Sequence, residues 1–356
     1  MDPAALAGRL EAQGERVAGS DAERRAAALC AQELRSGGRR PRTVTVWARL
    51  HRAPARALYA AIGIAGSLVA VHHAAVGLGL AAGALLAVIL EAAGVPVASI
   101  LQVRRATQNV VAPPPAERGG RALLVLTAAV DAPRNALLRR LARSRAGRRL
   151  PGAPGLLALA LAGVAACAGA RLGGAGGTAI GIVQLLPSIA LLLLAGGFVE
   201  EALSDFEPIA DGPAVALALA AALDAQPPRA MAVEVLIAGA GEAGAPGMAA
   251  YVGARRHDVA PEEVVVVHLG NARGPVRYVL SDGEDIPFRL HPRLIELAKA
   301  LPNAEPLRGR GRSAARVARG ARWPAIALEG DARPLAAAAL RLISAIDREL
   351  LQARGS

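Results

Sequence analysis

Two long stretches of the chain are almost free of charged residues. The first runs over residues 57–103. Because about twenty apolar residues cross the core of a bilayer, this stretch predicts two spanning helices, 57–76 and 79–101. The turn between them is expected near Gly77 and Gly79.

The second uncharged stretch covers residues 156–199 and is interrupted by the sequence RLGGAGG at 171–177. It predicts a second pair of spanning helices. The alternative is a set of buried helices in a large soluble core. A soluble helix needs a polar face, however, and a segment such as LLALALAGVAACAGA has none.

The remaining sequence alternates between strand-like and helix-like segments. The strand-like segments are RTVTVWARL, TQNVVA, RALLVLTAAVD, AMAVEVLIAGAG, EEVVVVHLGN, PVRYVLS and WPAIALEG. The helix-like segments between them include DGPAVALALAAALDAQ, APGMAAYVGARR, HPRLIELAKAL and residues 333–352. This alternation predicts a three-layer α/β domain around a mixed sheet, interrupted by two transmembrane helical hairpins.

The expected division of the chain follows from these patterns. Parts of the α/β domain are expected at 1–52, 104–154 and 201–356, and the two hairpins at 53–103 and 155–200. The middle segment, 104–154, contains eleven arginines and only two acidic residues. The positive-inside rule therefore predicts a multi-pass protein of the cell inner membrane, with the soluble domain and both termini in the cytoplasm.

Composition limits the possible partners. The chain of 356 residues has a formal net charge of +12, but only 2% of its residues are aromatic and Lys299 is its single lysine. The arginines are spread along the sequence, and the aromatic side chains that stack on bases are nearly absent, so we expect no nucleic-acid partner. The bias towards Ala, Gly and Arg is typical of a GC-rich, actinobacterial genome. Cys30 and Cys167 are expected to be buried small hydrophobes.

Three ionisable residues fall in or beside the first apolar stretch: His72, His73 and Glu91. Ionisable groups at membrane depth are costly and often mark an ion or proton path. These residues therefore indicate one alternative function, a small transporter with a regulatory domain. They could instead lie at the ends of the hairpin helices, at the level of the lipid headgroups.

The order of the soluble motifs resembles that of the family-28 zinc metallopeptidases, which comprise co-catalytic aminopeptidases and glutamate-carboxypeptidase-like proteins. The resemblance covers nearly all of the soluble sequence. The motifs are GERVAGSDAERRAAALCAQELRSGG, NVVA, TAAVDAP, ADGPAVALALAAALDAQ, AVEVLIAGAGEAGAPGMAAYV and VVVVHLGN, in that order. The resemblance implies a three-layer mixed sheet of the zinc-peptidase (phosphorylase/hydrolase-like) type. It also implies a two-zinc site, in which a carboxylate base takes a proton from metal-bound water.

The resemblance places the family's site on particular residues of this chain. The first ligand, a histidine in the family, falls on Ala129, which cannot bind zinc. Asp131 matches the aspartate that supports that histidine. The bridging aspartate falls on Asp211. The last ligand should be a histidine near the C-terminus, but the chain contains no histidine after His291.

The paired glutamates of the family are only half preserved. The position of the general base is Gly241, and the position of the neighbouring ligand is Glu242. The next ligand position is His268, which could bind zinc through an imidazole nitrogen. Each remaining residue also has an ordinary structural interpretation. Asp211 could cap a helix, Glu242 could be a solvated acid on a glycine-rich turn, and His268 could be a hydrogen-bonded structural histidine.

These residues favour a degenerate, membrane-embedded member of the family that binds a peptide or protein partner, or acts as a scaffold, without catalysis. The candidate metal residues Asp211, Glu242 and His268 are then vestigial, Asp131 supports them, and no cofactor is expected. The alternative is an active membrane-bound zinc aminopeptidase that uses those three residues. The lipid bilayer is a partner in either case.

Overall fold

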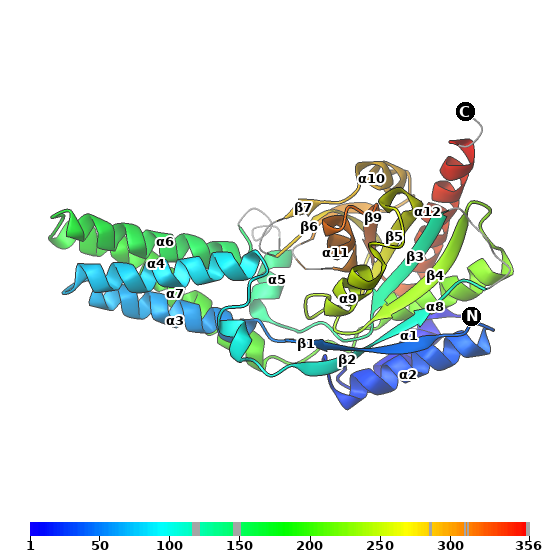
Figure 1. The fold of residues 1–356 in the computed structure, drawn as a ribbon, viewed down its shortest axis with the longest axis horizontal. Helices are drawn as coiled ribbons and strands as arrows, with labels where there is room; N and C mark the ends of the chain where they lie inside the picture. The colour runs from blue at the N-terminus through cyan, green and yellow to red at the C-terminus, as the bar shows by residue number, and fades with distance from the viewer. Residues whose placement is uncertain (116–121, 145–150, 285–286, 310, 312, 354–356) are drawn as a thin grey trace.

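The structure is a computed structural model that describes residues 1–115, 122–144, 151–284, 287–309, 311 and 313–353 (Figure 1). Parts of the arginine-rich segment 104–154 lie outside the described residues, as does the first residue of the predicted strand RALLVLTAAVD. Two bodies are visible in Figure 1, an α/β domain and an elongated bundle of helices that projects from it.

Nine strands of the described chain form one mixed sheet in the order β1-β2-β4-β3-β5-β9-β6-β7, with β8 paired to β6. Neighbours among β4, β3, β5 and β9 run parallel, whereas β1, β2, β6 and β7 pair antiparallel at the two sides. The strands are β1 (Arg42–Ala48), β2 (Arg105–Ala112), β3 (Ala122–Ala129), β4 (Met231–Ala238), β5 (Val264–Gly270), β6 (Arg277–Asp282), β7 (Phe288–Arg289), β8 (Glu305–Arg308) and β9 (Ala325–Glu329).

Helices cover both faces of this sheet. One face packs against α2 (Asp21–Ser36), α8 (Asp211–Ala225) and α12 (Ala332–Gln352), and α1 (Pro3–Glu11) packs on α8 and α12. The other face packs against α9 (Pro246–Arg255) and α11 (Ala314–Gly320), while α10 (Pro292–Lys299) contacts β6 and α12. The mixed α/β fold with a mixed sheet, expected from the alternating segments, is confirmed.

Local sequence explains the central elements. Every residue of β4 is buried, and β3 and β5 are nearly as buried, because helices cover both faces; their continuous apolar runs meet that requirement. The helix α2 begins after Ser20, whose side chain accepts a hydrogen bond from the backbone N–H of Glu23. The Glu23 carboxylate accepts in turn from the backbone N–H of Gly19 at 2.6 Å, a reciprocal arrangement close to a capping box.

The projecting bundle consists of α3 (Ala53–Val69), α4 (Ala74–Ala92), α6 (Ala153–Leu172) and α7 (Thr178–Leu203). The first two helices are shorter than the predicted spans 57–76 and 79–101, and the turn between them lies at 70–73. The turn expected near Gly77 and Gly79 is therefore wrong, because both glycines lie inside α4. The prediction overran because apolar residues continue past the helix ends: α4 stops before Gly94, whose φ of 94° a helix does not accept, and a short 3₁₀ turn, η1 (Ala98–Leu101), follows.

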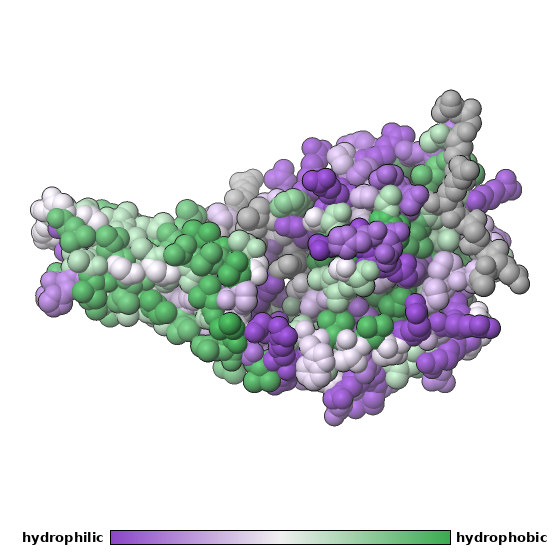
Figure 2. All heavy atoms as spheres, in the orientation of Figure 1, coloured by the Kyte–Doolittle hydropathy of each residue, from purple (hydrophilic) through white to green (hydrophobic). Residues whose placement is uncertain are grey.

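The outer surface of the bundle is apolar, and Figure 2 shows that this surface ends where the hydrophilic surface of the α/β domain begins. Leu186, Leu193 and Leu203 are 70–79% exposed. Inside the bundle the helices pack closely. A Cβ atom on Gly63 would lie only 2.4 Å from a methyl group of Leu161. By length and composition, α4, α6 and α7 are suited to cross a membrane, whereas α3, at 17 residues, is shorter.

Candidate functional site

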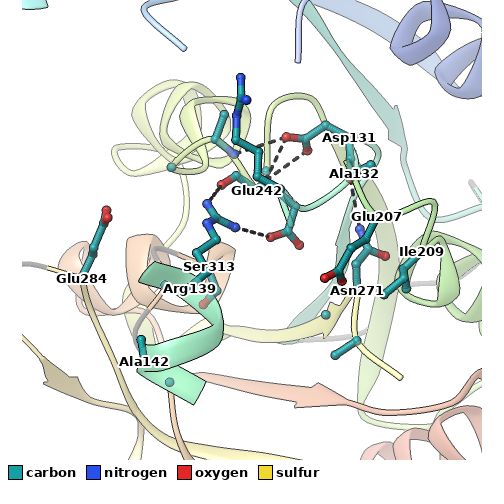
Figure 3. Close-up of a pocket in the computed structure, with 18 of the residues that line it drawn as sticks. Asp131, Ala132, Arg139, Ala142, Glu207, Ile209, Glu242, Asn271, Glu284 and Ser313 are labelled. Carbon is teal, nitrogen blue, oxygen red and sulfur yellow. Dashed lines mark hydrogen bonds and ion pairs between the residues drawn. The ribbon is translucent and has the colours of Figure 1, made fainter. Parts of the chain in front are cut away.

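A cleft of about 750 Å³ lies between the sheet and the base of the bundle. It is at the carboxyl ends of the parallel strands, the usual place for ligands in sheets of this kind. Asp131 and Ala132 line it just after β3, Glu242 after β4, and Asn271 after β5 (Figure 3). The short helix α5 (Leu137–Arg143) extends Arg139 into the cleft from the opposite side.

Asp131 holds the loop that carries Glu242. Its carboxylate accepts the backbone N–H of Glu242 at 3.0 and 3.1 Å and that of Ala243 at 3.2 Å. The residue is 1% exposed, and burial, followed by the negative charges of Glu23 and Glu242, raises its pKa well above the usual range for aspartate. The resemblance assigns to Asp131 the support of a metal-binding histidine. In this structure Asp131 instead accepts hydrogen bonds from backbone amides.

The positions of the first zinc ligand and of the general base touch one another. A Cβ atom built on Gly241 would lie 2.4 Å from the Cβ of Ala129 and 2.9 Å from its Cα. Real Cβ atoms do not approach that closely, so Gly241 has no space for a side chain while Ala129 keeps its place. The two positions to which the resemblance assigns a ligand and a base are therefore in direct contact, and no volume for a side chain lies between them.

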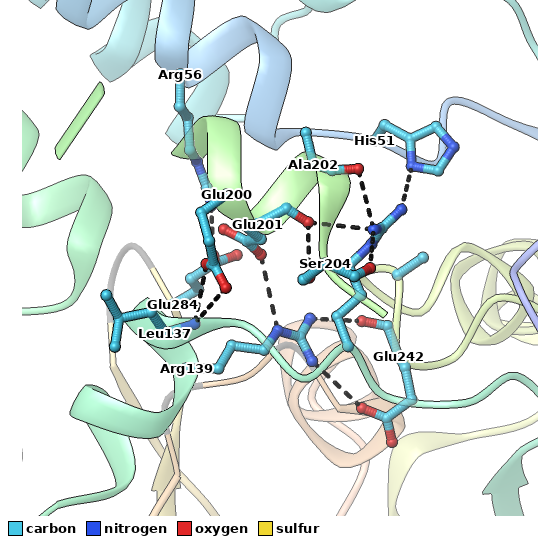
Figure 4. Close-up of polar contacts among 12 residues, drawn as sticks. His51, Arg56, Leu137, Arg139, Glu200, Glu201, Ala202, Ser204, Glu242 and Glu284 are labelled. Atoms are coloured by element: carbon cyan, nitrogen blue, oxygen red, sulfur yellow. Dashed lines mark hydrogen bonds and ion pairs between the residues drawn. The ribbon is translucent and has the colours of Figure 1, made fainter. Parts of the chain in front are cut away.

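Arg139 lies beside Glu242 in the cleft. Nη1 of Arg139 lies 3.8 Å from Oε2 of Glu242, and its Nη2 donates a hydrogen bond of 3.2 Å to the carbonyl oxygen of the same residue (Figure 4). Nε of Arg139 lies 3.7 Å from Oε1 of Glu201, near the end of α7. The guanidinium of Arg139 therefore lies between two carboxylates at the edge of the cleft.

Asp211 lies away from these groups. It is the first residue of α8, whose N-cap is Ala210, so the expectation that Asp211 caps its own helix is wrong. Its Oδ1 instead accepts the backbone N–H of Ala332, at the start of α12, at 3.0 Å. Its Oδ2 has no hydrogen-bond partner among the described residues, although Nε of Arg273 lies 4.0 Å away. Burial is the main cause that raises the pKa of Asp211.

His268 is a buried histidine on β5 that faces the cleft. It is 6% exposed, and within the described part of the chain its Nδ1 has no hydrogen-bond partner. Burial lowers its pKa from the ordinary 6.5 to about 4, so the ring is neutral at pH 7. The sequence predicted a hydrogen-bonded structural histidine, but at Nδ1 the expected hydrogen bond is missing among the described residues.

The described residues do not fit a zinc centre. They contain no group of three or more His, Cys, Asp or Glu side chains placed to hold a metal ion. Of the three candidates, Asp211 accepts a hydrogen bond at the start of α12, Glu242 contacts Arg139, and Nδ1 of His268 has no partner among the described residues. We therefore derive no chemical step through zinc at this site.

Two residues that the sequence did not single out hold the cleft together. The side chain of Asn271 accepts the backbone N–H of Gly212 and donates to the carbonyl oxygens of Ala129 and Asp131, at 3.1 to 3.2 Å. The available signal was a polar residue directly after the strand VVVVHLG.

The second such residue is Arg134. Its Nη1 donates at 3.1 to 3.2 Å to three carbonyl oxygens at the end of α7, those of Glu201, Ala202 and Ser204, and its guanidinium lies 4.5 Å from the ring centre of Phe206. A cation at the C-terminal end of a helix is favourable. Arg134 thus attaches the bundle to the loop after β3.

The three ionisable residues of the first hairpin are far apart along the bundle. His72 and His73 are exposed in the turn between α3 and α4, at the end of the bundle away from the sheet. Glu91 lies near the other end, where its Oε1 accepts hydrogen bonds from the hydroxyl of Tyr59 and the backbone N–H of Ser99, both at 2.9 Å. The three residues therefore do not form a continuous polar path within the described chain, and no observation favours a transporter.

A comparison with protein-family models gives no match, and one with curated proteins gives no significant match. Among solved structures, the chain is similar to a zinc aminopeptidase from Bacillus subtilis (12% identity, TM-score 0.46, covering 97% of this chain and 92% of that one). It is also similar to a Zn-dependent exopeptidase from Parabacteroides distasonis (8%, 0.49, 97% and 96%) and to glutaminyl cyclase from Porphyromonas gingivalis (11%, 0.49, 99% and 97%). The structural neighbours are thus zinc aminopeptidases and glutaminyl cyclases, but these similarities are too distant to assign an activity.

Proposed function

We propose that this chain is an integral membrane protein whose α/β domain binds a peptide, or a segment of a partner protein, in the cleft without hydrolysing it. The observation that carries the proposal is the contact between Ala129 and Gly241. Loss of a general base alone costs about 10²–10⁴ in rate. Here the space for that base is closed as well.

The properties of the cleft support a binding role. Its volume of about 750 Å³ lies within the range of ligand pockets, about 300–1,000 Å³. Its lining combines apolar side chains with both signs of charge: Leu50, Ile209, Leu307, Glu207, Arg273 and Arg308. A peptide offers the same combination, since it carries apolar side chains, charged side chains and charged termini.

The exposed surface of the bundle supports the membrane location. Monomeric soluble proteins rarely expose contiguous apolar patches larger than a few hundred Å². The bundle exposes large apolar side chains on all four helices, for example Leu68, Leu86, Leu159 and Leu193 at 56–70% exposure. Lipid acyl chains would cover them. The arginines at the base of the bundle favour a cytoplasmic position for the α/β domain.

Catalysis is tested with the detergent-purified protein. We expect it to contain no stoichiometric zinc by elemental mass spectrometry, and neither to release N-terminal residues from aminoacyl substrates nor to cyclise N-terminal glutamine. A Glu242→Ala variant is the control. About one zinc per chain, lost in that variant together with an aminopeptidase activity, would replace this proposal with the active enzyme.

Binding is tested by placing a photo-crosslinking amino acid at Ala142, which lines the cleft, and separately at Ala222, which is exposed near the far end of α8. The protein in nanodiscs is exposed to a library of synthetic peptides. The proposal predicts peptides that crosslink at position 142 and not at position 222. If no peptide distinguishes the two positions, the cleft is not a peptide-binding site.

The orientation is tested by cysteine labelling in intact cells. Ala175 lies in the exposed turn between α6 and α7, and Gln226 is exposed in the α/β domain. A membrane-impermeant maleimide should label Ala175→Cys in intact spheroplasts and Gln226→Cys only after lysis. The native Cys30 and Cys167 are buried, which keeps the background low. The opposite labelling pattern would invert the proposed orientation.

A further inference from the structure

A second cavity lies at the base of the bundle and differs in chemistry from the cleft. Its volume is about 220 Å³. It is enclosed by the end of β1, the start of α3, the end of α4 and the loop that follows α4. The polar residues that line it are Arg49, Arg52, Arg56, Tyr59, Glu91, Ser99 and Gln102.

Two side chains in this cavity have buried polar atoms without partners. Among the described residues, Nε of Arg49 has no hydrogen-bond acceptor, and neither the Nε2 nor the Oε1 of Gln102 has a hydrogen-bond partner. Leaving a buried donor or acceptor unsatisfied costs about 1–3 kcal/mol, and more for a charged group. Two donors and one acceptor that line one cavity therefore indicate a ligand that provides both an anionic oxygen and a hydrogen-bond donor.

The one carboxylate in the cavity is already used. Oε1 of Glu91 accepts hydrogen bonds from the hydroxyl of Tyr59 and from the backbone N–H groups of Val97 and Ser99, at 2.9, 3.4 and 2.9 Å. Glu91 thus shapes the loop that forms one wall. Arg52 and Arg56 also line the cavity, but Arg56 is paired with Glu284, which lines the neighbouring cleft. Arg49 is therefore the cation on which the preference for an anion rests.

The cavity is located at the boundary between the apolar bundle and the polar domain. Around it, the loop after α4 and the turn η1 expose apolar side chains to solvent: Val95 is 50% exposed, Ile100 57%, and both Leu101 and Val103 81%. If the bundle crosses a bilayer, this level coincides with the lipid headgroups, and the exposed side chains would contact the first part of the acyl chains.

We propose that this cavity binds the phosphate group of an anionic phospholipid headgroup. Arg49 and Nε2 of Gln102 would donate to the phosphate oxygens, and Oε1 of Gln102 would accept from a hydroxyl of the headgroup, as in phosphatidylglycerol. Basic pockets at the cytoplasmic ends of membrane helices bind anionic headgroups in this way. The inference rests on the membrane location proposed above, and it assigns a specific lipid contact that the location alone does not require.

The experiment measures thermal unfolding of the full-length protein in neutral detergent during titration with phosphatidylglycerol, with phosphatidylcholine of the same acyl chains, or with inorganic phosphate. We expect saturable stabilisation by phosphatidylglycerol and little by phosphatidylcholine. Equal effects of the two lipids would overturn the proposal. Saturable stabilisation by inorganic phosphate alone, lost on mutation of Arg49, would reassign the cavity to a free anion.

Two variants and a matched control distinguish a site from general charge attraction. Arg49→Gln should weaken the apparent affinity for phosphatidylglycerol roughly tenfold or more, the value of a hydrogen bond to a charged group. Arg104→Gln removes the same charge from an exposed residue on the same side, and screening should limit its effect to about twofold. Equal losses in the two variants would show that no site exists.

The second variant, Gln102→Leu, keeps the proposal testable if Arg49→Gln unfolds. Because the amide atoms of Gln102 have no partners in the described chain, we expect the variant to be at least as stable as the wild type without lipid. It should nevertheless lose the gain from phosphatidylglycerol. Flotation with vesicles tests insertion separately. Failure to float would refute the membrane location, whereas flotation without lipid preference would refute only the cavity's role.

Discussion

Gly241→Ala is the most direct test of whether the position that the resemblance assigns to the general base has space for a side chain. The new methyl group would meet the Cβ of Ala129 at 2.4 Å and its Cα at 2.9 Å, and the second of these atoms belongs to the backbone of a central strand. Overpacking of this kind costs about 1–3 kcal/mol. The φ angle of Gly241 is not in the left-handed region, so alanine brings no backbone strain there and would otherwise stabilise by about 0.4–1 kcal/mol.

The net expectation is a destabilisation of about 1–2 kcal/mol, or a melting temperature lower by roughly 2–8 °C in a domain of this size. Thermal unfolding in detergent, followed by near-ultraviolet circular dichroism, measures it. Gly253→Ala is the matched control: its Cβ would meet nothing within 4 Å on an exposed helical turn of α9, and it should stabilise slightly. A neutral or stabilising Gly241→Ala would refute the reasoning, because the site would then have space for a catalytic side chain.

Two further predictions concern the sides of the cleft. The pKa of His268 is lowered to about 4, so the unfolded chain takes up a proton there before the folded protein does. The free energy of unfolding is therefore full above pH 6.5 and falls by up to about 3 kcal/mol between pH 6.5 and 4. His268→Leu should flatten the pH dependence of the melting temperature in that window, and an unchanged slope would contradict the assignment. Arg134→Met removes the donor to three carbonyl groups at the end of α7 and should destabilise the protein by about 2 kcal/mol. The control is Arg140→Met, which replaces an exposed arginine on α5. It should change the free energy of unfolding by less than about 0.5 kcal/mol in the same assay.

The pattern of hydrophobic residues predicted the mixed α/β fold and the helices of the two hairpins, because strands buried on two faces and long uncharged helices both leave strong signals. The hairpin ends were less predictable. Apolar residues continue through Val95 and Ile100, and only the backbone at Gly94 ends the helix.

The candidate site was predictable only as a set of positions. The resemblance placed Asp131 and Glu242 in one site, and the carboxylate of Asp131 accepts the backbone N–H of Glu242. It could not show that Asp211 bonds to α12, because that contact joins residues 121 positions apart. It also missed Arg139, since an arginine in an arginine-rich segment carries no distinguishing signal until the fold places it beside two carboxylates.

Arg139 provides the last test, because its two ion pairs and its hydrogen bond to the carbonyl oxygen of Glu242 link the bundle to the α/β domain. Its side chain is 33% exposed and lies between the carboxylates of Glu201 and Glu242, which are 13% and 21% exposed. Exposed pairs contribute about 0–1 kcal/mol and buried ones cost about 3–5 kcal/mol when broken. We expect Arg139→Leu, with its carboxylates left without this cation, to destabilise by about 2 kcal/mol at pH 7.

The pH and metal dependence of that variant identify the cause. Burial raises the pKa of Glu201, so protonation of this carboxylate as the pH falls should remove the repulsion, and the difference between Arg139→Leu and the wild type should shrink. Adding Glu242→Gln should restore part of the stability at pH 7. Added zinc should restore none of the lost stability. A guanidinium can pair with the single charge of Glu242, whereas a zinc ion requires several ligands arranged around it. Rescue by zinc would show that a metal site persists beneath the arginine and would refute the proposed non-catalytic function.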